Sequence, residues 1–350
     1  AIGGNGGNGG NDVDPGGEAN YGGAWSRAGS PGVPAINYDP FSLNITGITS
    51  GNLWELWQWD EGINYWPLYG QPERTSYFGN YRWYSGYGGG AYCDVNSNVT
   101  FIDCQISGNV AQGGMSGQGG LQAPSTRPTD PLVPYEIPSF GGGVYCAAEA
   151  TVTFTGCAIA NNISSPPVLV DPADPASGLR YRLDPYLGHG GGVCAEDTAQ
   201  VVFNNCTFSE NEASVGGGFN WANANPAISD CNFTFNSAFQ GGGLFGEHGP
   251  GTIIGCNITN NEAVSDPNVE GELLGAGGGI HCWATDVNII DCNISSNQAE
   301  TSGGGVYFGG ENYSSLINCL ITKNLAGRDG GGVSANIYSD VNIVNCTIAD

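Results

Sequence analysis

Cysteine is the residue type in this 350-residue chain whose number and spacing point most directly to chemistry. The chain has 12 cysteines but no CxxC pair and only three histidines, so it lacks the usual pattern of a zinc site. Four cysteines each precede another cysteine by 10 to 12 residues, which favours disulfides over metal binding. The predicted pairs are Cys93–Cys104, Cys146–Cys157, Cys194–Cys206 and Cys282–Cys292.

The four remaining cysteines fall in consecutive units of a repeat, as Cys231 with Cys256 and Cys319 with Cys346. Two hypotheses stay open for them. They form disulfides between neighbouring units, or they are free thiols that pack in a core as small hydrophobic side chains. Alkylation before reduction would distinguish the two, because it counts the free thiols.

Acidic side chains outnumber basic ones, 33 against 8, and the net charge is −25. Binding to nucleic acid is not expected, because no basic patch is available to neutralise phosphates. Asp103, Asp230 and Asp291 recur near one predicted strand junction and form a weak candidate site for Ca²⁺. Exposure to solvent explains these carboxylates equally well, so no cofactor is required.

The cysteines are positioned by a repeat that opens with three glycines. A short apolar stretch follows each triplet, then a cysteine, and shortly afterwards an Ile or Phe with Asn three residues later. Uninterrupted repeats have periods of 25 to 27 residues. The eight triplets begin at Gly88, Gly141, Gly190, Gly216, Gly241, Gly277, Gly303 and Gly330.

Apolar residues alternate within each repeat, as Val201 and Phe203 do, which is the period of a β-strand. A unit of this length has no room for an ordinary helix and cannot bury its apolar face alone, so the units must stack. The sequence therefore predicts an all-β parallel β-helix of about eight coils, with three short strands per coil. Strands stacked about 4.8 Å apart would make a rod roughly 38 Å long.

The repeat resembles that of the polymorphic outer-membrane protein family and of other pectate-lyase-like surface β-helices. The resemblance rests on the GGG opening and on Phe or Ile, two residues, then Asn, as in Ile106–Asn109 and Phe208–Asn211. It covers Gly88 to the end of the chain and implies a right-handed parallel β-helix. It says little about function, because this architecture occurs in adhesins, structural proteins and polysaccharide enzymes.

Polysaccharide enzymes of this architecture provide a test for catalysis. Polygalacturonases resemble one another in carboxylate motifs, a GHG motif and a distal basic motif. This chain has His189 between two glycines, but it adjoins a repeat triplet, and neither the paired Asp nor an Arg-Ile-Lys motif is present. Only Lys323 and Arg328 are basic within the coils, so a base for a lyase reaction is scarcely available. We therefore expect the chain not to be an enzyme.

The first 87 residues differ from the repeats. Residues 1–17 are rich in Gly, Asn and Asp, a composition typical of a flexible tail unless it lies against the rod or a neighbouring subunit. Residues 18–87 hold six of the eight tryptophans. We interpret them as a cap on the open end of the first coil, because terminal repeats must be atypical. The alternative is a set of aromatic platforms that stack on sugars.

Three long insertions interrupt the β-helix of residues 88–350, at 110–140, 163–189 and 262–276. Because they occur at one equivalent turn, they should project from one edge of the rod. The first two are rich in proline and carry Arg127, Arg180 and Arg182 on an otherwise acidic molecule. This edge is the candidate contact surface for another copy or for a different partner.

Asparagine recurs at one turn of the repeats and elsewhere in Asn-X-Ser/Thr sequences. At the turn we predict a left-handed backbone conformation and a ladder of hydrogen-bonded amides. The turn residues are Asn109, Asn162, Asn211, Asn236, Asn261, Asn297 and Asn324. The candidate glycosylation sites are Asn44, Asn98, Asn232, Asn257, Asn293 and Asn312, of which the three that follow a core cysteine should point outward.

These features predict an extracellular or cell-surface location. No apolar stretch is long enough to span a bilayer, and we expect any export signal to have been removed before Ala1. The last repeat stops at Asp350, one residue before its turn asparagine, and an uncovered end invites head-to-tail contact with another copy.

We therefore predict a secreted, non-catalytic structural protein that assembles head-to-tail into an extracellular filament or surface layer. The first alternative is a cell-surface adhesin that binds carbohydrate through the aromatic segment or the insertion edge. The second alternative is a polysaccharide lyase or hydrolase. The expected partners are other copies of the chain and, under the first alternative, glycans.

Overall fold

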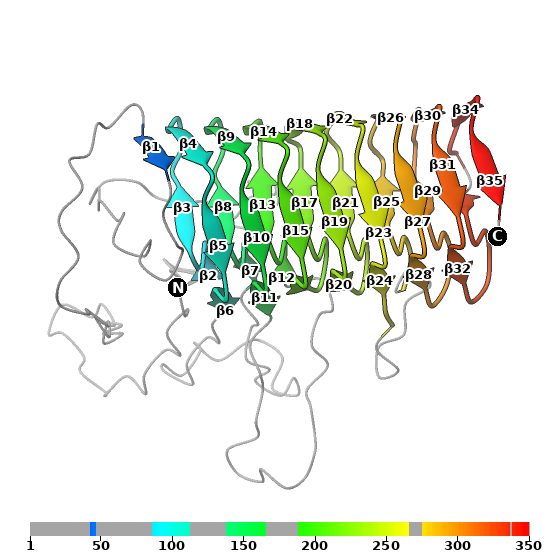
Figure 1. The fold of residues 1–350 in the computed structure, drawn as a ribbon, viewed down its shortest axis with the longest axis horizontal. Helices are drawn as coiled ribbons and strands as arrows, with labels where there is room; N and C mark the ends of the chain where they lie inside the picture. The colour runs from blue at the N-terminus through cyan, green and yellow to red at the C-terminus, as the bar shows by residue number, and fades with distance from the viewer. Residues whose placement is uncertain are drawn as a thin grey trace, which may run out of the picture.

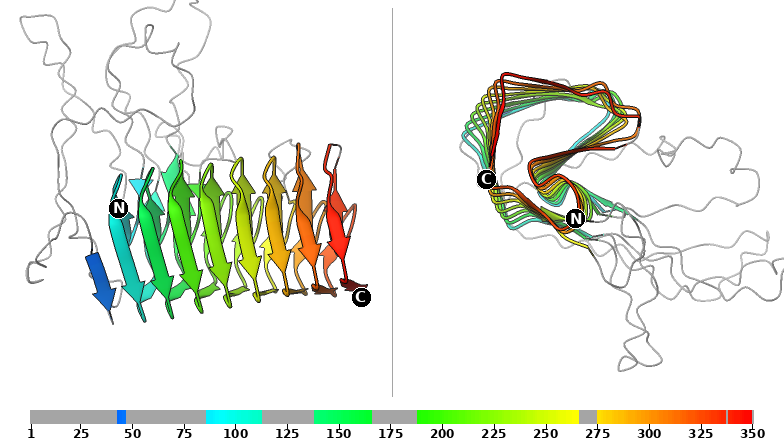
Figure 2. Two further views of the ribbon diagram at one scale, coloured as in Figure 1. Left: turned by 90° about the horizontal axis from the view of Figure 1, so that it is seen from above. Right: turned by 90° about the vertical axis from the view of Figure 1, so that its right-hand side faces the viewer.

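The chain folds as a right-handed parallel β-helix, in which short strands stack into long sheets along a rod (Figure 1). The computed structural model describes residues 43–46, 86–112, 138–165, 188–265, 275–336 and 338–349. Viewed along the rod in Figure 2, successive coils lie over one another. The predicted fold class is confirmed, and no helix occurs among the described residues.

Sheet 1 begins directly after the glycine triplets and has eight strands. Both of its faces are buried in the middle of the rod, as the fully buried strand Val193–Glu196 shows. Its strands are β3 (Ala91–Cys93), β8 (Val144–Cys146), β13 (Val193–Glu196), β17 (Phe219–Ala222), β21 (Leu244–Glu247), β25 (Ile280–Trp283), β29 (Val306–Gly309) and β33 (Val333–Ala335).

Sheet 2 follows sheet 1 around each coil and has nine strands, because β1 pairs with β4 ahead of the first repeat. Its residues alternate between the core and the outer surface, so only one face is buried. Its strands are β1 (Leu43–Thr46), β4 (Asn98–Ile102), β9 (Thr151–Thr155), β14 (Gln200–Asn204), β18 (Asn225–Ser229), β22 (Gly251–Ile254), β26 (Val287–Ile290), β30 (Ser315–Ile317) and β34 (Asn342–Val344).

Sheets 3 and 4 complete the wall of the rod. The strands of sheet 3 are β5 (Gln105–Ser107), β10 (Ala158–Ala160), β15 (Thr207–Ser209), β19 (Asn232–Thr234), β23 (Asn257–Thr259), β27 (Asn293–Ser295), β31 (Leu320–Thr322) and β35 (Thr347–Ala349). Those of sheet 4 are β6 (Val110–Gln112), β11 (Ile163–Ser165), β16 (Glu212–Ala213), β20 (Ser237–Ala238), β24 (Glu262–Ala263), β28 (Gln298–Ala299) and β32 (Leu325–Ala326).

A fifth, smaller sheet precedes the glycine triplets. Its strands are β2 (Gly86–Tyr87), β7 (Ser139–Phe140) and β12 (Gly188–His189). Single parallel pairings continue it from His189 through Val215 and Gln240 to Ala276. A coil therefore has four or five strands, so the prediction of three was wrong. The extra strands were missed because two-residue strands are too short to show an alternating pattern.

The core consists of columns of like residues stacked from coil to coil. Phe101, Phe154 and Phe203 lie face to face in sheet 2, with ring centroids 4.7 and 4.8 Å apart. The register that brings these rings together also pairs every residue of β9 with its equivalent in β14. Repeated burial of the same apolar position thus holds the coils together, since a single coil could not bury it.

The turn asparagines form the predicted ladder. The Asn211 amide donates from Nδ2 to Oδ1 of Asn236 at 2.9 Å, and Asn236 does the same to Asn261 at 2.9 Å. The left-handed conformation was assigned to the wrong residue, however. It belongs to the residue before each ladder asparagine, such as Asn260 with a φ of 56°. The ladder asparagine is buried because its amide satisfies backbone groups of neighbouring coils.

The glycine triplets are required by backbone crowding. Gly190 has a φ of 61°, and a Cβ atom on it would lie 2.2 Å from the carbonyl oxygen of Val193. A Cβ atom on Gly191 would lie 2.5 Å from the carbonyl oxygen of Gly217 in the next coil. The triplets therefore mark a corner where side chains do not fit, as the sequence indicated.

The predicted tail at 1–17 and cap at 18–87 lie outside the described residues, except for β1 and residues 86 and 87. Most of the three insertions lies outside them as well. The strands next to the insertions are β6, β11 and β24, which all belong to sheet 4. This arrangement agrees with the prediction that the insertions leave the rod at one edge.

Candidate functional site

Eight cysteines form a continuous column at the corner between sheets 2 and 3. The backbone N–H of Cys206 donates to Sγ of Cys231 at 3.3 Å, and that of Cys231 donates to Sγ of Cys256 at 3.4 Å. All but the last member are buried. The column consists of Cys104, Cys157, Cys206, Cys231, Cys256, Cys292, Cys319 and Cys346. Each thiol inside the column therefore has a cysteine neighbour one coil above and one coil below, and the end members Cys104 and Cys346 have one such neighbour.

All 12 cysteines are free thiols in the structure, so it contains none of the predicted disulfides. Sequence spacing paired eight cysteines within their own coils, whereas Cys93 and Cys146 are register partners in neighbouring coils. The four remaining cysteines were assigned to neighbouring units, and Cys231 contacts Cys256 while Cys319 contacts Cys346. Burial raises the pKa of the Cys146 and Cys282 thiols, which keeps both neutral. Whether any pair is oxidised stays a prediction for the alkylation experiment.

The structure does not bring Cys194 and Cys206 together. Cys146 is the register partner of Ala195, so Cys194 lies one residue out of step and points to the opposite face of sheet 1. Cys194 belongs to a cluster with Phe140 and Tyr145, while Cys206 belongs to the interior core. A disulfide between them would require a change in the register of β13.

The three aspartates of the candidate Ca²⁺ site share one position of the coil. Asp103, Asp230 and Asp291 have φ values of 50°, 53° and 54° at the corner between sheets 2 and 3. Other coils lie between them, so the carboxylates are about 10 Å or more apart. No group of three metal-ligating side chains occurs among the described residues. The left-handed corner explains these aspartates, and Ca²⁺ binding stays a prediction.

The candidate glycosylation sites fall in different environments. Asn232, Asn257 and Asn293 are register partners on the outer face of sheet 3, and their amides contact one another at 3.1 and 3.4 Å. Asn98 is exposed at the start of β4. Asn312 was a wrong choice, because it is fully buried and accepts a hydrogen bond from the Ser314 N–H at 3.1 Å. The side chain of Asn44 lies outside the described residues.

A buried acid lies on the outer face of sheet 1. Glu196 is only 6% exposed, and Oε2 accepts a hydrogen bond from the Tyr145 hydroxyl at 2.9 Å. Burial raises the pKa of Glu196 to about 7, and the hydrogen bond from Tyr145 limits the rise. Burial, together with the Glu196 charge, also raises the pKa of Tyr145. The sequence analysis did not single out Glu196, because nothing in the repeat indicates that the outer face of sheet 1 is buried.

A buried histidine lies on the same face, three coils further along. His281 is fully buried between Phe245 and Tyr307, with ring centroids 4.9 and 4.7 Å away. Its Nδ1 contacts the Ala276 carbonyl oxygen at 3.3 Å, while Nε2 has no hydrogen-bond partner. Burial lowers the pKa of His281 to about 3, so the ring is neutral near pH 7. His189, the candidate from the GHG comparison, stacks on Phe140 at 4.9 Å.

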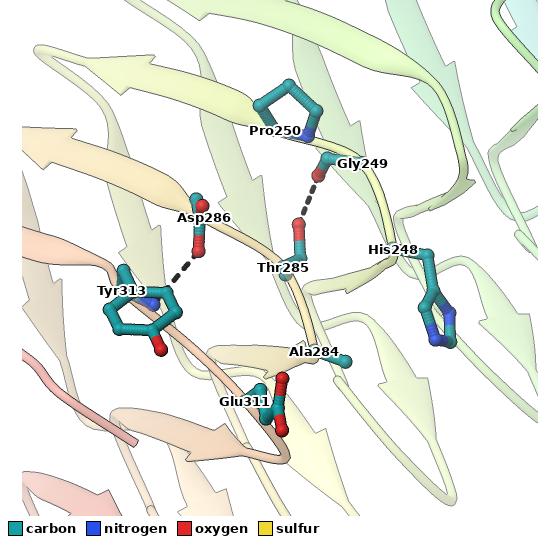
Figure 3. Close-up of a pocket in the computed structure, with 8 residues that line it drawn as sticks. All are labelled: His248, Gly249, Pro250, Ala284, Thr285, Asp286, Glu311 and Tyr313. Atoms are coloured by element: carbon teal, nitrogen blue, oxygen red, sulfur yellow. Dashed lines mark hydrogen bonds between the residues drawn. The ribbon is translucent and has the colours of Figure 1, made fainter. Parts of the chain in front are cut away.

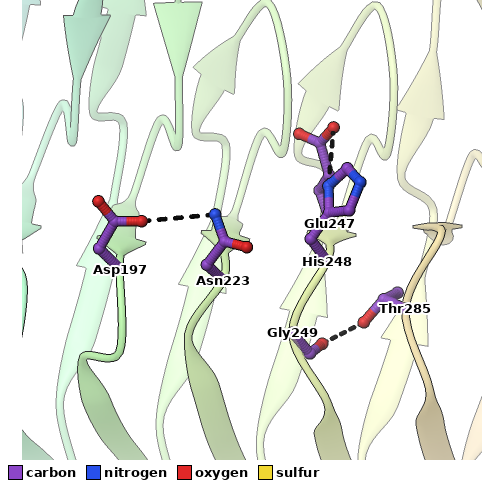
Figure 4. A network of polar contacts seen from close by, with 6 residues as sticks. All are labelled: Asp197, Asn223, Glu247, His248, Gly249 and Thr285. Carbon is purple, nitrogen blue, oxygen red and sulfur yellow. Dashed lines mark hydrogen bonds and ion pairs between the residues drawn. The ribbon is translucent and has the colours of Figure 1, made fainter. Parts of the chain in front are cut away.

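Polar side chains follow the corner between sheets 1 and 2 from coil to coil (Figure 4). Asn223 donates from Nδ2 to the Asp197 carboxylate at 3.4 Å, and His248 pairs with Glu247 at 3.3 Å. The Thr285 hydroxyl donates to the Gly249 carbonyl oxygen. The first and third of these contacts join neighbouring coils, while the pair of His248 with Glu247 lies within one coil.

An open pocket of about 560 Å³ lies at this corner (Figure 3). Small residues of one coil, Ala284 and Thr285, lie between side chains of the coils on either side. His248 lines one side, and Glu311 and Tyr313 line the other. The sequence analysis did not predict this pocket, because it depends on unequal corner lengths in neighbouring coils.

The predicted contact residues Arg127, Arg180 and Arg182 lie outside the described residues. The described residues form no helix long and apolar enough to cross a membrane. The contact surface that the insertions would form therefore stays a prediction.

Comparison with known families gives one match, to the family described as "Right handed beta helix region", over residues 135–288. Searches of curated proteins and of solved structures found no match. The match supports the pectate-lyase-like fold, and the likeness to polymorphic outer-membrane proteins stays a prediction. Because such β-helices occur in surface proteins, adhesins and polysaccharide-active enzymes, the match identifies the fold of this chain rather than its activity.

Proposed function

We propose that this chain is a non-catalytic structural protein, an extracellular rod that associates with other copies of itself into a filament or surface layer. The observation that carries the proposal is the outer face of sheet 2. This face is uncharged and carries an exposed apolar stripe, although the molecule as a whole has a net charge of −25.

The apolar stripe is formed by equivalent residues of four successive coils. Ile254, Ile290, Ile317 and Val344 are register partners whose side chains point outward. Ile254 is 40% exposed and Val344 is 46% exposed, while the two between them are half-buried. β-Branched side chains in register make a flat, stiff surface that loses little freedom on contact with a second surface.

The rest of the face adds no charge. None of the nine strands of sheet 2 contains Asp, Glu, Lys or Arg. Sheet 4 carries Glu212 and Glu262, so two copies that meet there bring carboxylates together, which opposes contact. The strands of sheet 3 are uncharged too, but their outward side chains are mostly small or polar and form no apolar stripe. Meeting through sheet 2 avoids this repulsion and buries the apolar stripe.

The size of the face suits a contact between copies. Nine strands about 4.8 Å apart and three to five residues long cover roughly 38 by 14 Å, or roughly 530 Å². A standard protein interface buries about 800 Å² per partner, so we expect a moderate affinity and association that rises with concentration. This contact runs along the side of the rod and closes as a pair of copies, so growth into a filament or layer also uses the separate head-to-tail contact predicted from the sequence.

Sedimentation velocity over a range of concentrations, with electron microscopy of the most concentrated samples, tests the proposal. We expect the wild-type protein to associate and Ile317→Lys to shift it to monomers, because the lysine must be desolvated in the contact. Leu320→Lys is the matched control, since Leu320 is 46% exposed on sheet 3 and its replacement should leave association unchanged. The proposal would be contradicted if the wild-type protein stays monomeric up to about 1 mM. It would also be contradicted if Ile317→Lys and Leu320→Lys change association equally.

A further inference from the structure

The pocket between sheets 1 and 2 exists because the corner lengthens along the rod. Two residues, 223 and 224, connect β17 to β18, and three connect β25 to β26. Five residues, 310–314, connect β29 to β30. The longer corner carries Glu311 and Tyr313 beyond the small residues Ala284 and Thr285 of the preceding coil (Figure 3).

The aromatic ring of Tyr313 is available to a ligand. Tyr313 is 66% exposed, and its backbone N–H donates to Oδ1 of Asp286 at 2.9 Å, which anchors the residue beside the pocket. An exposed aromatic ring that is not part of a core offers a flat apolar surface, on which the face of a sugar ring can stack.

The charge of the pocket is negative. Asp286 and Glu311 both line it, and Glu311 forms no hydrogen bond or ion pair with the described part of the chain. The cations nearest in sequence, Lys323 and Arg328, follow β31 and β32 on the far side of the coil and do not line the pocket. His248 already contacts Glu247. Glu311 is therefore free to pair with a cationic ligand, and Asp286 offers its second carboxylate oxygen, since Oδ1 accepts from the Tyr313 N–H.

We propose that this pocket binds an amino sugar, with one face of the sugar stacked on Tyr313 and its protonated amine paired with Asp286 and Glu311. A single ligand of this class uses both features of the pocket, the ring and the charge. The pocket volume of about 560 Å³ lies within the range of about 300–1,000 Å³ for small-molecule sites. The same carboxylates disfavour uronic acids, because like charges repel. This site is separate from the proposed contact between copies.

Titration with a tetramer of β-1,4-linked glucosamine at pH 7, followed by calorimetry and NMR, tests the proposal. We expect binding that weakens with added salt. Tyr313→Ala should weaken it about 10-fold, and Asp286→Asn combined with Glu311→Gln should weaken it about 10-fold or more and remove the salt dependence. The N-acetylated tetramer should bind about 10-fold more weakly than the free amine, because its nitrogen is uncharged.

Matched controls are available at equivalent sites. Tyr338 is 75% exposed in the corner of the next coil and does not line the pocket, so Tyr338→Ala should bind like the wild type. Glu262→Gln removes an exposed carboxylate on sheet 4 and should do the same. The proposal would be overturned if the amino-sugar tetramer does not bind at about 10 mM or if the acetylated tetramer binds equally well. Loss of binding in the two control variants would overturn it as well. Tetralysine serves as a cationic ligand without a sugar ring. If it binds with the same affinity as the sugar, and Tyr313→Ala does not change that affinity, the assignment to a sugar would be overturned.

Discussion

The two faces of sheet 1 are both buried, but they are filled by different kinds of side chain. The inner face repeats one type of residue, with Val144, Val193, Phe219 and Leu244 in register around the core. The outer face changes from coil to coil, from Tyr145 and Cys194 to Asn220, Phe245, His281 and Tyr307.

The two faces therefore have different roles: one governs the stability of the fold, and the other governs how that stability responds to pH. The inner face contains no group that titrates near pH 7, so its packing should be the same at any physiological pH. The outer face holds Glu196, whose pKa burial raises to about 7, and His281, whose pKa burial lowers to about 3. The inner face therefore sets how stable the rod is, and the outer face sets how that stability depends on pH.

Gly246→Val should show the largest effect, because it overfills the inner face. A Cβ atom on Gly246 would lie 2.1 Å from Cζ2 of Trp221, its register partner in the preceding coil. We expect a loss of about 3–4 kcal/mol in the free energy of unfolding, measured by urea denaturation. In the double variant, Trp221→Ala should restore part of the lost stability, because it leaves space for the valine side chain. Additive losses would contradict the proposed complementarity.

Glu196→Gln should remove most of the pH dependence between about pH 4.5 and 7. The pKa of Glu196 is about 7 in the folded chain and near 4.5 when unfolded, so the folded state binds the proton more tightly. The stabilisation that Glu196 contributes is fully present below about pH 4.5 and is lost as the pH rises through 7. At pH 8 we expect Gln to be more stable by up to about 3 kcal/mol. Tyr145→Phe is the control, because it removes the hydrogen bond that limits the pKa rise and should steepen the same loss.

His281→Phe tests the opposite, acidic side of the profile. The pKa of His281 is about 3 when folded and near 6.5 when unfolded, so stability is complete above about pH 6.5 and is lost as pH falls toward 3. By pH 4.5 we expect the wild type to have lost about 2.7 kcal/mol that the Phe variant retains. His248→Phe is the control, because His248 is exposed beside Glu247. A wild-type profile that His281→Phe leaves unchanged would show that another group controls the acid limb.

The repeated features of the fold could be predicted from the sequence, because stacking makes each coil obey the same rules. The positions of the glycine triplets and the ladder of Asn211, Asn236 and Asn261 follow directly from the period. The position of the cysteine column also follows from the period, but the contacts that each cysteine makes do not. Spacing along the chain suggested a contact within a coil for Cys206, whereas stacking gives it a contact with Cys231 in the next coil.

The candidate sites could not be predicted, because they arise where coils differ. The pocket needs Tyr313 in a corner longer than its neighbour, and the buried Glu196 needs a cover over the outer face of sheet 1. Neither feature leaves a periodic signal. The apolar stripe on sheet 2 was visible as Ile254 and Ile290, but alternation alone does not say which apolar residues of a continuous run face outward.

Gly309→Ala should show the smallest effect, and it tests whether the two faces of sheet 1 tolerate an added side chain differently. Gly309 lies beneath Trp283 on the outer side of sheet 1, and a Cβ atom there would lie 2.7 Å from Cε3 of that ring. The contact matches the one between Gly246 and Trp221, but Trp283 is half-buried and can move toward solvent, whereas Trp221 is enclosed. We therefore expect Gly309→Ala to cost less than about 1 kcal/mol and to shift the fluorescence of Trp283. Gly246→Ala should cost several times more, and equal losses would show that enclosure does not determine the cost.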